Sequence, residues 1–160
     1  MLTAKEVSLY FLNKDKKKKL FNKNIVDYNN HTSYEGNIRL NKYLFLSQVV
    51  YLAKYNQKLF LDDFLAYDNG PVINEVMNSY LNIINTKEIP NIDESKKVFL
   101  DKIYESLKNA TYEELIEITH EDPEWQRLSS KTYKTPKMDI ERNLEEYKKR
   151  YKGLLEALDI

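Results

Sequence analysis

The stretch Asn37–Tyr55, NIRLNKYLFLSQVVYLAKY, decides the fold of this chain. Apolar residues recur along it at helical spacing and occupy nearly every face, and Asn37 is a suitable N-cap. A helix that is apolar all round, and too short to span a bilayer, belongs in the centre of a protein core. We therefore expect a buried helix from Asn37 to about Tyr55, with the other elements packed around it.

Start signals outside this stretch predict further helices. Thr3 with Glu6, and Thr111 with Glu114, have the spacing of a capping box, in which two side chains satisfy free backbone groups of the first turn. Asp93 can cap another helix, whose apolar residues follow at helical spacing. The sequence thus predicts a mainly α fold, a compact bundle of five to six helices around the central one.

A second informative stretch is Ala66–Val76, AYDNGPVINEV. The strand-like run before it stops at Asn69-Gly70, a pair that tolerates positive φ. Pro71 has a φ suited to a first helical turn, so we expect a helix over residues 71–81. The preceding segments, residues 59–61 and 64–67, predict a small β-hairpin or a bent extended element. A free helix N-terminus after Gly70 would also suit an anion, which is the alternative interpretation of this turn.

Composition limits the function classes. The chain has 160 residues, which we take as one domain, and its 25 basic and 25 acidic side chains give a formal net charge of zero. Such a balance favours neither nucleic acid nor an anionic membrane. Cysteine is absent, the N-terminal charges follow the apolar part rather than precede it, and no apolar run spans a bilayer. We expect a cytoplasmic protein without a membrane segment.

Two polar segments interrupt the pattern. Residues 27–37, DYNNHTSYEGN, are rich in turn formers and predict a surface loop. The run from Lys14 to Lys19 is typical of a solvated loop or helix end. The alternative for the Lys16–Lys19 block is a phosphate-binding patch of a nucleic-acid-binding regulator.

Enzymatic motifs are scarce. The three glycines are far apart, so no glycine-rich phosphate loop exists, and the only histidines are His31 and His120. The cluster THEDPEW, residues 119–125, combines an imidazole with carboxylates, which would suit a small metal-dependent hydrolase centred on His120. Its spacing fits no metal-ligand motif, and a structural role is the simpler interpretation, with Trp125 buried and its indole N–H paired. We predict no catalytic residues, no metal and no cofactor.

Three stretches taken together resemble one family. The matching residues are Leu40, Lys42, Leu44, Leu52, Ala53, Leu59, Phe60, Ala66, Tyr67, Gly70, Pro71, Val72 and Val76, followed by Leu115, Thr119, His120, Pro123 and Trp125. In order and spacing they resemble the SocA-like antitoxins, also called the Panacea domain and formerly known as phage-associated proteins. The resemblance covers about residues 38–125. Tyr67 stands where the family often has Trp, and Phe45 where it often has Tyr.

The resemblance implies a mainly helical fold with a short β element and no catalytic role. Family members pair with toxins encoded by neighbouring genes and neutralise them by direct contact, and one member presents its toxin to an intracellular protease. Members of this family neutralise many unrelated toxins, so membership alone does not identify the partner of this chain. The loop at residues 27–37 and the charged C-terminal region lie outside the recognised motifs, and partner specificity could reside there.

The C-terminal region has an apolar stripe along one face of a predicted helix. A helix is expected over about residues 139–158, with apolar or tyrosine side chains spaced alternately by four and three: Ile140, Leu144, Tyr147, Tyr151, Leu154 and Leu158. One interpretation is that this stripe docks on the protein's own core. The other is that its distal half, with Tyr147, Tyr151 and Leu155, is open to a toxin helix or to a second copy of the chain.

Overall fold

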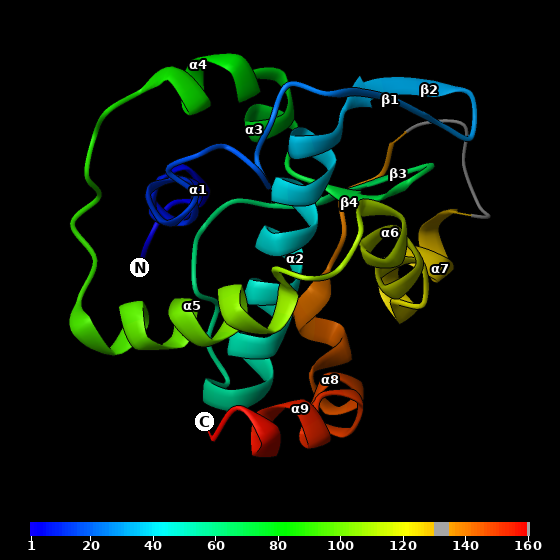
Figure 1. Ribbon diagram of the computed structural model, residues 1–160. Coiled ribbons are helices and arrows are strands. Elements are labelled where there is room, and N and C mark those ends of the chain that lie inside the picture. Colours follow the sequence, from blue (N-terminus) through cyan, green and yellow to red (C-terminus); the bar gives the residue numbers. More distant parts are fainter. Residues whose placement is uncertain (130–134, 160) are drawn as a thin grey trace.

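The computed structural model describes residues 1–129 and 135–159. Within these residues the chain forms nine α-helices, one short 3-10 helix and two small antiparallel sheets (Figure 1). The prediction of a mainly α fold is confirmed. The helices are α1 Ala4–Lys14, α2 Glu35–Tyr55, α3 Asn74–Asn78, α4 Tyr80–Asn85, α5 Glu94–Leu107, α6 Tyr112–His120, α7 Pro123–Ser129, η1 Ile140–Asn143, α8 Leu144–Arg150 and α9 Lys152–Ala157. The strands are β1 Ile25–Tyr28, β2 His31–Tyr34, β3 Leu65–Tyr67 and β4 Gly70–Val72.

Helix α2 runs through the middle of the molecule and contacts α1, α5, α6, α8 and β4 (Figure 1). It is buried on nearly every face, as predicted. Its start differs from the prediction, because the helix begins at Glu35 and Asn37 lies inside it. Asn37 is buried there and donates a hydrogen bond to the backbone carbonyl of Met77 at 3.0 Å. A side chain predicted to cap the helix therefore fixes a distant segment instead.

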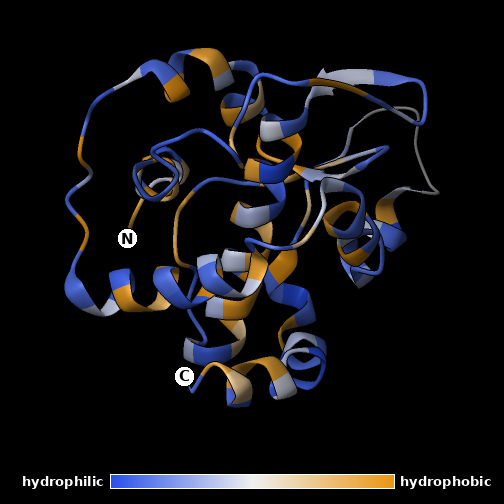
Figure 2. Ribbon diagram, viewed as in Figure 1, coloured by the Kyte–Doolittle hydropathy of each residue, from blue (hydrophilic) through white to orange (hydrophobic). Residues whose placement is uncertain are grey.

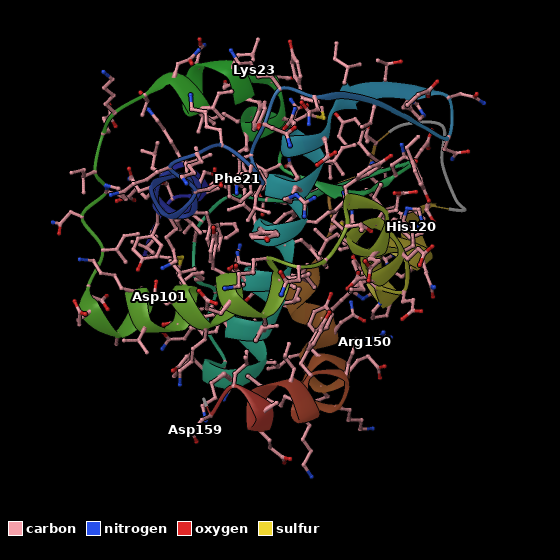
Figure 3. The ribbon with its side chains drawn as sticks, in the orientation of Figure 1. Phe21, Lys23, Asp101, His120, Arg150 and Asp159 are labelled. Atoms are coloured by element: carbon pink, nitrogen blue, oxygen red, sulfur yellow. The ribbon has the colours of Figure 1, made fainter. Side chains whose placement is uncertain are left out.

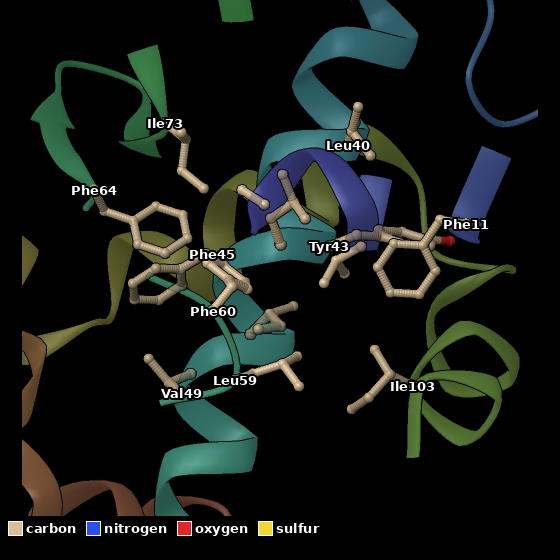
Figure 4. Packing of buried hydrophobic residues seen from close by; sticks show 14 of the residues in the cluster. Phe11, Leu40, Tyr43, Phe45, Val49, Leu59, Phe60, Phe64, Ile73 and Ile103 are labelled. Carbon is tan, nitrogen blue, oxygen red and sulfur yellow. The ribbon is translucent and has the colours of Figure 1, made fainter. Parts of the chain in front are cut away.

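Aromatic rings from distant parts of the chain fill the core around α2 (Figure 4). Phe45 of α2 meets Phe64 edge to face, with ring centroids 5.1 Å apart. Tyr43 meets Phe11 of α1 in the same geometry at 5.5 Å. Edge-to-face pairs of this kind add to the stabilisation that comes from burial alone. The core thus joins the first helix and the segment before β3 to the central helix.

Strands β1 and β2 form a hairpin where the sequence predicted a loop. Its turn residues, Asn29 and Asn30, have φ values of 53° and 67°. Two consecutive positive φ values are typical of the tight hairpin turn whose twist matches that of the strands, and Asn tolerates them better than most residues. The prediction of a loop at residues 27–37 was therefore wrong, because the strands are too polar to show an alternating apolar pattern.

Strands β3 and β4 form the second hairpin, in which Ala66 faces Pro71. Pro71 is a strand residue, so the predicted helix start at this residue was wrong, and α3 begins at Asn74. The predicted pairing partner was also wrong. Residues 59–61 bond instead with Leu2, whose backbone joins Leu59 and Leu61 at 3.2 and 3.0 Å. On its other edge, β3 bonds with the segment at residues 136–138.

The predicted C-terminal helix is divided into η1, α8 and α9, and the predicted helix over residues 71–81 is divided into α3 and α4. The interruptions occur at Asn143, Tyr151 and Ser79, whose φ is near −100° and whose ψ is 19°, 8° and 12°. Tyr147 and Tyr151 are 0% and 8% exposed, so the stripe docks on the protein's own core. Of the two interpretations of the stripe, these buried rings bear out docking on the core, and they contradict the alternative in which the two rings are open to a partner. Leu155 is half-buried, and its role in partner binding stays a prediction.

The predicted start signals at three helices are present. Thr3 with Glu6 and Thr111 with Glu114 form complete capping boxes, and the Asp93 side chain accepts a hydrogen bond from the third residue after it. In the part of the chain that the structure describes, no helix has the length and apolar character to cross a membrane.

Candidate functional site

The residues picked out from the sequence gather around the β3–β4 hairpin. Strand β4 contacts α2 and α6, and β3 contacts α7, so the hairpin joins the central helix to the α6–α7 segment, which lies far from it in the sequence. Figure 2 shows hydrophilic residues interspersed with hydrophobic ones along α2; several of the polar side chains of α2 are buried, and Lys42 is bonded to the hairpin. We call the group Lys42, Gly70, Thr119, His120 and Trp125 the hairpin cluster.

Lys42 is the charged member of the hairpin cluster. Its side chain is 2% exposed, and its ammonium donates a hydrogen bond to the carbonyl of Pro71 at 3.0 Å. Within the described residues, no carboxylate forms a salt bridge with it. Burial disfavours the charged form and lowers the pKa of Lys42 to about 7. The neutral amine is therefore favoured far more at this position than in an exposed lysine.

Gly70 makes room for this lysine. Its φ is +118°, which side chains other than that of glycine rarely adopt. A Cβ at this position would lie 3.0 Å from both Lys42 Nζ and Thr119 Oγ1. The predicted need for glycine is confirmed, and the reason is both the backbone conformation and the packing of two polar side chains against it.

Trp125 and His120 close the cluster at the junction of α6 and α7, where Figure 3 labels His120. The Trp125 indole donates a hydrogen bond to the carbonyl of Tyr67 at 2.7 Å, so its predicted pairing is confirmed. The ring is half-buried rather than fully buried, and it stacks on His120 with centroids 4.2 Å apart and planes 5° apart. Burial and then the nearby charge of Lys42 lower the pKa of His120. At neutral pH His120 is accordingly uncharged.

Two carboxylates of residues 119–125, on either side of Pro123, are buried and structural, a role that the sequence did not show. Asp122 accepts hydrogen bonds from the Trp125 backbone at 2.9 Å and from the Tyr147 hydroxyl at 2.7 Å. Glu124 is fully buried and pairs with Arg127 through two hydrogen bonds of 2.9 and 2.8 Å. No spacing rule marks acids of this kind, although acids beside a proline at a helix start are frequent caps. They attach the end of the hairpin cluster to the C-terminal helices.

The two hairpins lie beside each other. The Asn69 side chain donates to the carbonyl of Tyr28 at 3.3 Å, and His31 approaches Asp68 at 3.6 Å. Between the hairpins and α2 lies a cavity of about 430 Å³, and Lys42 is part of its lining. The cavity has a size typical of small-ligand sites, roughly 300–1,000 Å³.

The other predicted features are placed as follows. Lys16–Lys19 are exposed in a loop, which the buried carboxylate of Asp15 holds through the backbone amides of Lys19, Leu20 and Phe21. In residues 1–129 and 135–159, no three His, Cys, Asp or Glu side chains come together as ligands for a metal ion. Leu40 is fully buried in α2, and Val72 lies in the wall of the cavity.

Residues 40–126, more than half of the chain, match the sequence model of one protein family. That family is described as "Antitoxin SocA-like, Panacea domain". The chain belongs to this antitoxin family. The resemblance seen in the sequence is confirmed, and the Panacea match includes the whole hairpin cluster. Hairpin β1–β2 and helices α1, α8 and α9 lie outside it. No curated protein and no solved structure matches the chain.

Proposed function

We propose that this protein is an antitoxin that neutralises a toxin, encoded by a neighbouring gene, through direct contact in the cytoplasm. The match to the SocA-like antitoxin family over residues 40–126 carries the proposal. The role is non-catalytic and needs no cofactor, and the chain acts as a single domain. The hydrogen bonds described for the hairpin cluster agree with this, because Lys42 and Trp125 use them to hold the backbone of the β3–β4 hairpin.

The toxin-specific surface is, in this proposal, the outer side of the β1–β2 hairpin. This hairpin lies outside the family match, as a surface that differs between partners would. Ile25 is 71% exposed there, a large apolar side chain on a two-stranded sheet. An exposed strand edge can add a further strand from a partner. The side chain of Asn69, in the turn of the β3–β4 hairpin, holds the β1–β2 hairpin by donating to the carbonyl of Tyr28.

Two modes of neutralisation follow from the family. The antitoxin either inhibits the toxin by covering it or delivers it to an intracellular protease. The two modes differ in the lifetime of the toxin inside cells. Inhibition leaves the toxin present and inactive, whereas delivery shortens its half-life when the antitoxin is co-expressed. Half-life measurements with and without the antitoxin therefore distinguish them.

The experiment begins with the gene next to this one, expressed alone and together with the antitoxin. We expect growth arrest in the first case, rescue in the second, and a complex that stays intact in size-exclusion chromatography. The Ile25→Asp variant should weaken binding at least tenfold. Ile89→Asp is the matched control, because Ile89 is 86% exposed in the connector between α4 and α5, outside both hairpins.

Different results contradict different parts of the proposal. A wild-type protein that neither binds nor rescues overturns the antitoxin function. Normal binding by Ile25→Asp moves the contact surface away from the β1–β2 hairpin, in which case Leu155 is the next residue to change.

A further inference from the structure

Residues 16–24, KKKKLFNKN, form a strongly basic loop between α1 and β1, which we call the basic loop. It contains five lysines and no acidic residue, and all five lysines are exposed. Within the described residues none of the five forms a salt bridge, whereas the neighbouring Lys14 pairs with Asp101 at 2.9 Å. Because the whole chain has no net charge, its other residues carry five more acidic than basic side chains. Positive charge is therefore concentrated on this loop.

The basic loop is anchored at both ends. The buried carboxylate of Asp15 accepts hydrogen bonds from three successive backbone amides, those of residues 19–21, at 3.1, 2.9 and 2.8 Å. The ring of Phe21 is fully buried in the core. Near the far end, the Tyr80 hydroxyl donates to the carbonyl of Asn22 at 2.7 Å. The lysines are thus presented on a fixed backbone, so a partner that binds them orders little chain in doing so.

The basic loop adjoins the surface that we propose as the toxin contact. Lys23, labelled at the top of the molecule in Figure 3, lies two residues before Ile25, about 7 Å along an extended chain. The backbone amide of Glu35, directly after β2, donates to the carbonyl of Asn24 at 2.7 Å, so the loop joins the hairpin at its base. Loop and hairpin both lie outside the family match over residues 40–126. A partner on the hairpin is therefore within reach of the lysines.

We infer that the basic loop binds an acidic patch on the surface of the toxin, beside the apolar contact at Ile25. The inference rests on the proposed function, because it states the chemistry of the surface that the toxin presents. Nucleic acid fits the loop less well. A phosphate backbone extends past so short a segment and meets the acidic remainder of the chain, and the one aromatic ring of the loop, Phe21, is buried and cannot stack on a base.

Exposed charges of this kind act mainly on the rate of association. Complementary charges steer two proteins together and raise the association rate constant, an effect that falls as salt rises. Once the complex has formed, exposed ion pairs contribute little to its stability. The basic loop should therefore determine how fast the toxin is captured, whereas the apolar contact at Ile25 determines how long it stays bound.

The test measures toxin binding by wild type and by two variants, each with four lysines changed to glutamine. The loop variant changes Lys16, Lys17, Lys19 and Lys23. Lys18 is kept, because its φ is +51°. The control variant changes four lysines outside the loop that are exposed and form no salt bridge within the described residues: Lys5, Lys54, Lys149 and Lys152. Both variants lose the same charge, so a difference between them reports where the charge lies. Circular dichroism and melting temperatures check that both are folded.

At about 50 mM salt, we expect the loop variant to associate with the toxin at least tenfold more slowly than wild type, with a dissociation rate constant within about threefold. The control variant should associate within about threefold of wild type. Raising the salt to about 200 mM should slow wild type more than the loop variant, because screening removes what the loop contributes. Equal association rates for wild type and the loop variant at low salt overturn the inference and leave the antitoxin function intact.

A second measurement does not depend on the toxin. A labelled decaglutamate peptide and a short DNA duplex are titrated into the three proteins at low salt, and fluorescence anisotropy is followed. The inference expects the peptide to bind wild type and the control variant more tightly than the loop variant. No binding of the peptide to wild type, or equal binding by the loop variant, contradicts a site for an acidic patch.

Two further outcomes concern the source of the negative charge. A duplex that binds wild type more tightly than the peptide does, and that the loop variant no longer binds, assigns the basic loop to nucleic acid and overturns the inference. A wild type that binds decaglutamate but not the product of the neighbouring gene overturns the toxin as the source of the acidic patch, together with the proposed function.

Discussion

The Tyr147 hydroxyl donates a hydrogen bond of 2.7 Å to the Asp122 carboxylate, and both side chains are buried. Asp122 lies within the family-matched segment, and Tyr147 lies on α8, beyond its end. A direct bond therefore connects the shared domain to a region that the family match does not include. Tyr147 also belongs to the hydrophobic core, so α8 packs against the segment that the family match covers.

Replacing Tyr147 with Phe should destabilise the protein by about 1–3 kcal/mol, because a buried carboxylate loses a hydrogen-bond donor. Urea unfolding followed by circular dichroism measures the change. Tyr55→Phe is the control, since Tyr55 is 44% exposed, and we expect a change within about 0.5 kcal/mol. Equal stability of the two variants would show that the Tyr147–Asp122 bond makes no net contribution.

Gly70→Ala should cost about 1–3 kcal/mol. The φ of +118° strains any residue with a Cβ, and that Cβ would press on Lys42 and Thr119. Gly153→Ala is the matched control, because a Cβ there meets nothing within 4 Å and the residue lies in helix α9. Alanine should stabilise that position by up to roughly 1 kcal/mol. Melting temperatures that shift in the same direction for both variants would contradict the proposed strain at Gly70.

Gln48→Met should be among the most destabilising single changes, at about 3 kcal/mol or more. The buried amide of Gln48 donates to the carbonyl of Phe60 at 2.8 Å and accepts from the amides of Leu59 and Phe60 at 2.7 and 3.2 Å. Methionine fills the space but leaves these backbone groups unpaired. Gln57→Met changes an exposed glutamine and should be nearly neutral. Similar unfolding midpoints for the two variants would refute this account.

Lys42 should make the stability of the protein depend on pH between about 7 and 10.5. Its pKa is lowered from 10.5 to about 7 in the folded protein, so the unfolded chain binds more protons in this window. The free energy of unfolding therefore rises with pH there, and the contribution is lost as pH falls through 7. From pH 7 to pH 9, wild type should gain roughly 1–3 kcal/mol relative to Lys42→Met. Parallel pH profiles for the two proteins would show that Lys42 titrates normally.

The elements that depend on local chemistry could be predicted from the sequence. The capping box of Thr3 with Glu6 forms within a single turn, and the apolar faces of residues 37–55 require burial wherever the helix lies. Pro71 misled the prediction because its φ suits a first helical turn and an edge strand equally well. Tertiary contacts decide between helix and strand here, since β3 pairs with β4 on one edge and with residues 136–138 on the other.

In the candidate site, too, the sequence could predict some features and not others. The spacing of Lys42, Gly70 and Trp125 along the chain gave no reason to place them together, and only the family resemblance grouped them. The stripe with Tyr147 predicted an apolar face, but a pattern of that kind does not distinguish the protein's own core from a partner. Asp122 could not be identified, because its partners come from a helix 25 residues away and from its own turn.

The polar side chains of α2 affect how the protein unfolds locally. Asn41 accepts a hydrogen bond from the backbone amide of Ile73, Lys42 holds Pro71, and Gln48 holds residues 59–60. Each contact fixes a different piece of backbone to one rigid helix. In hydrogen exchange, the loss of Gln48 should therefore speed exchange at Leu59 and Phe60 while the amide of Ile73 stays protected. Segments of the chain would then exchange one at a time, with α2 the last to lose protection.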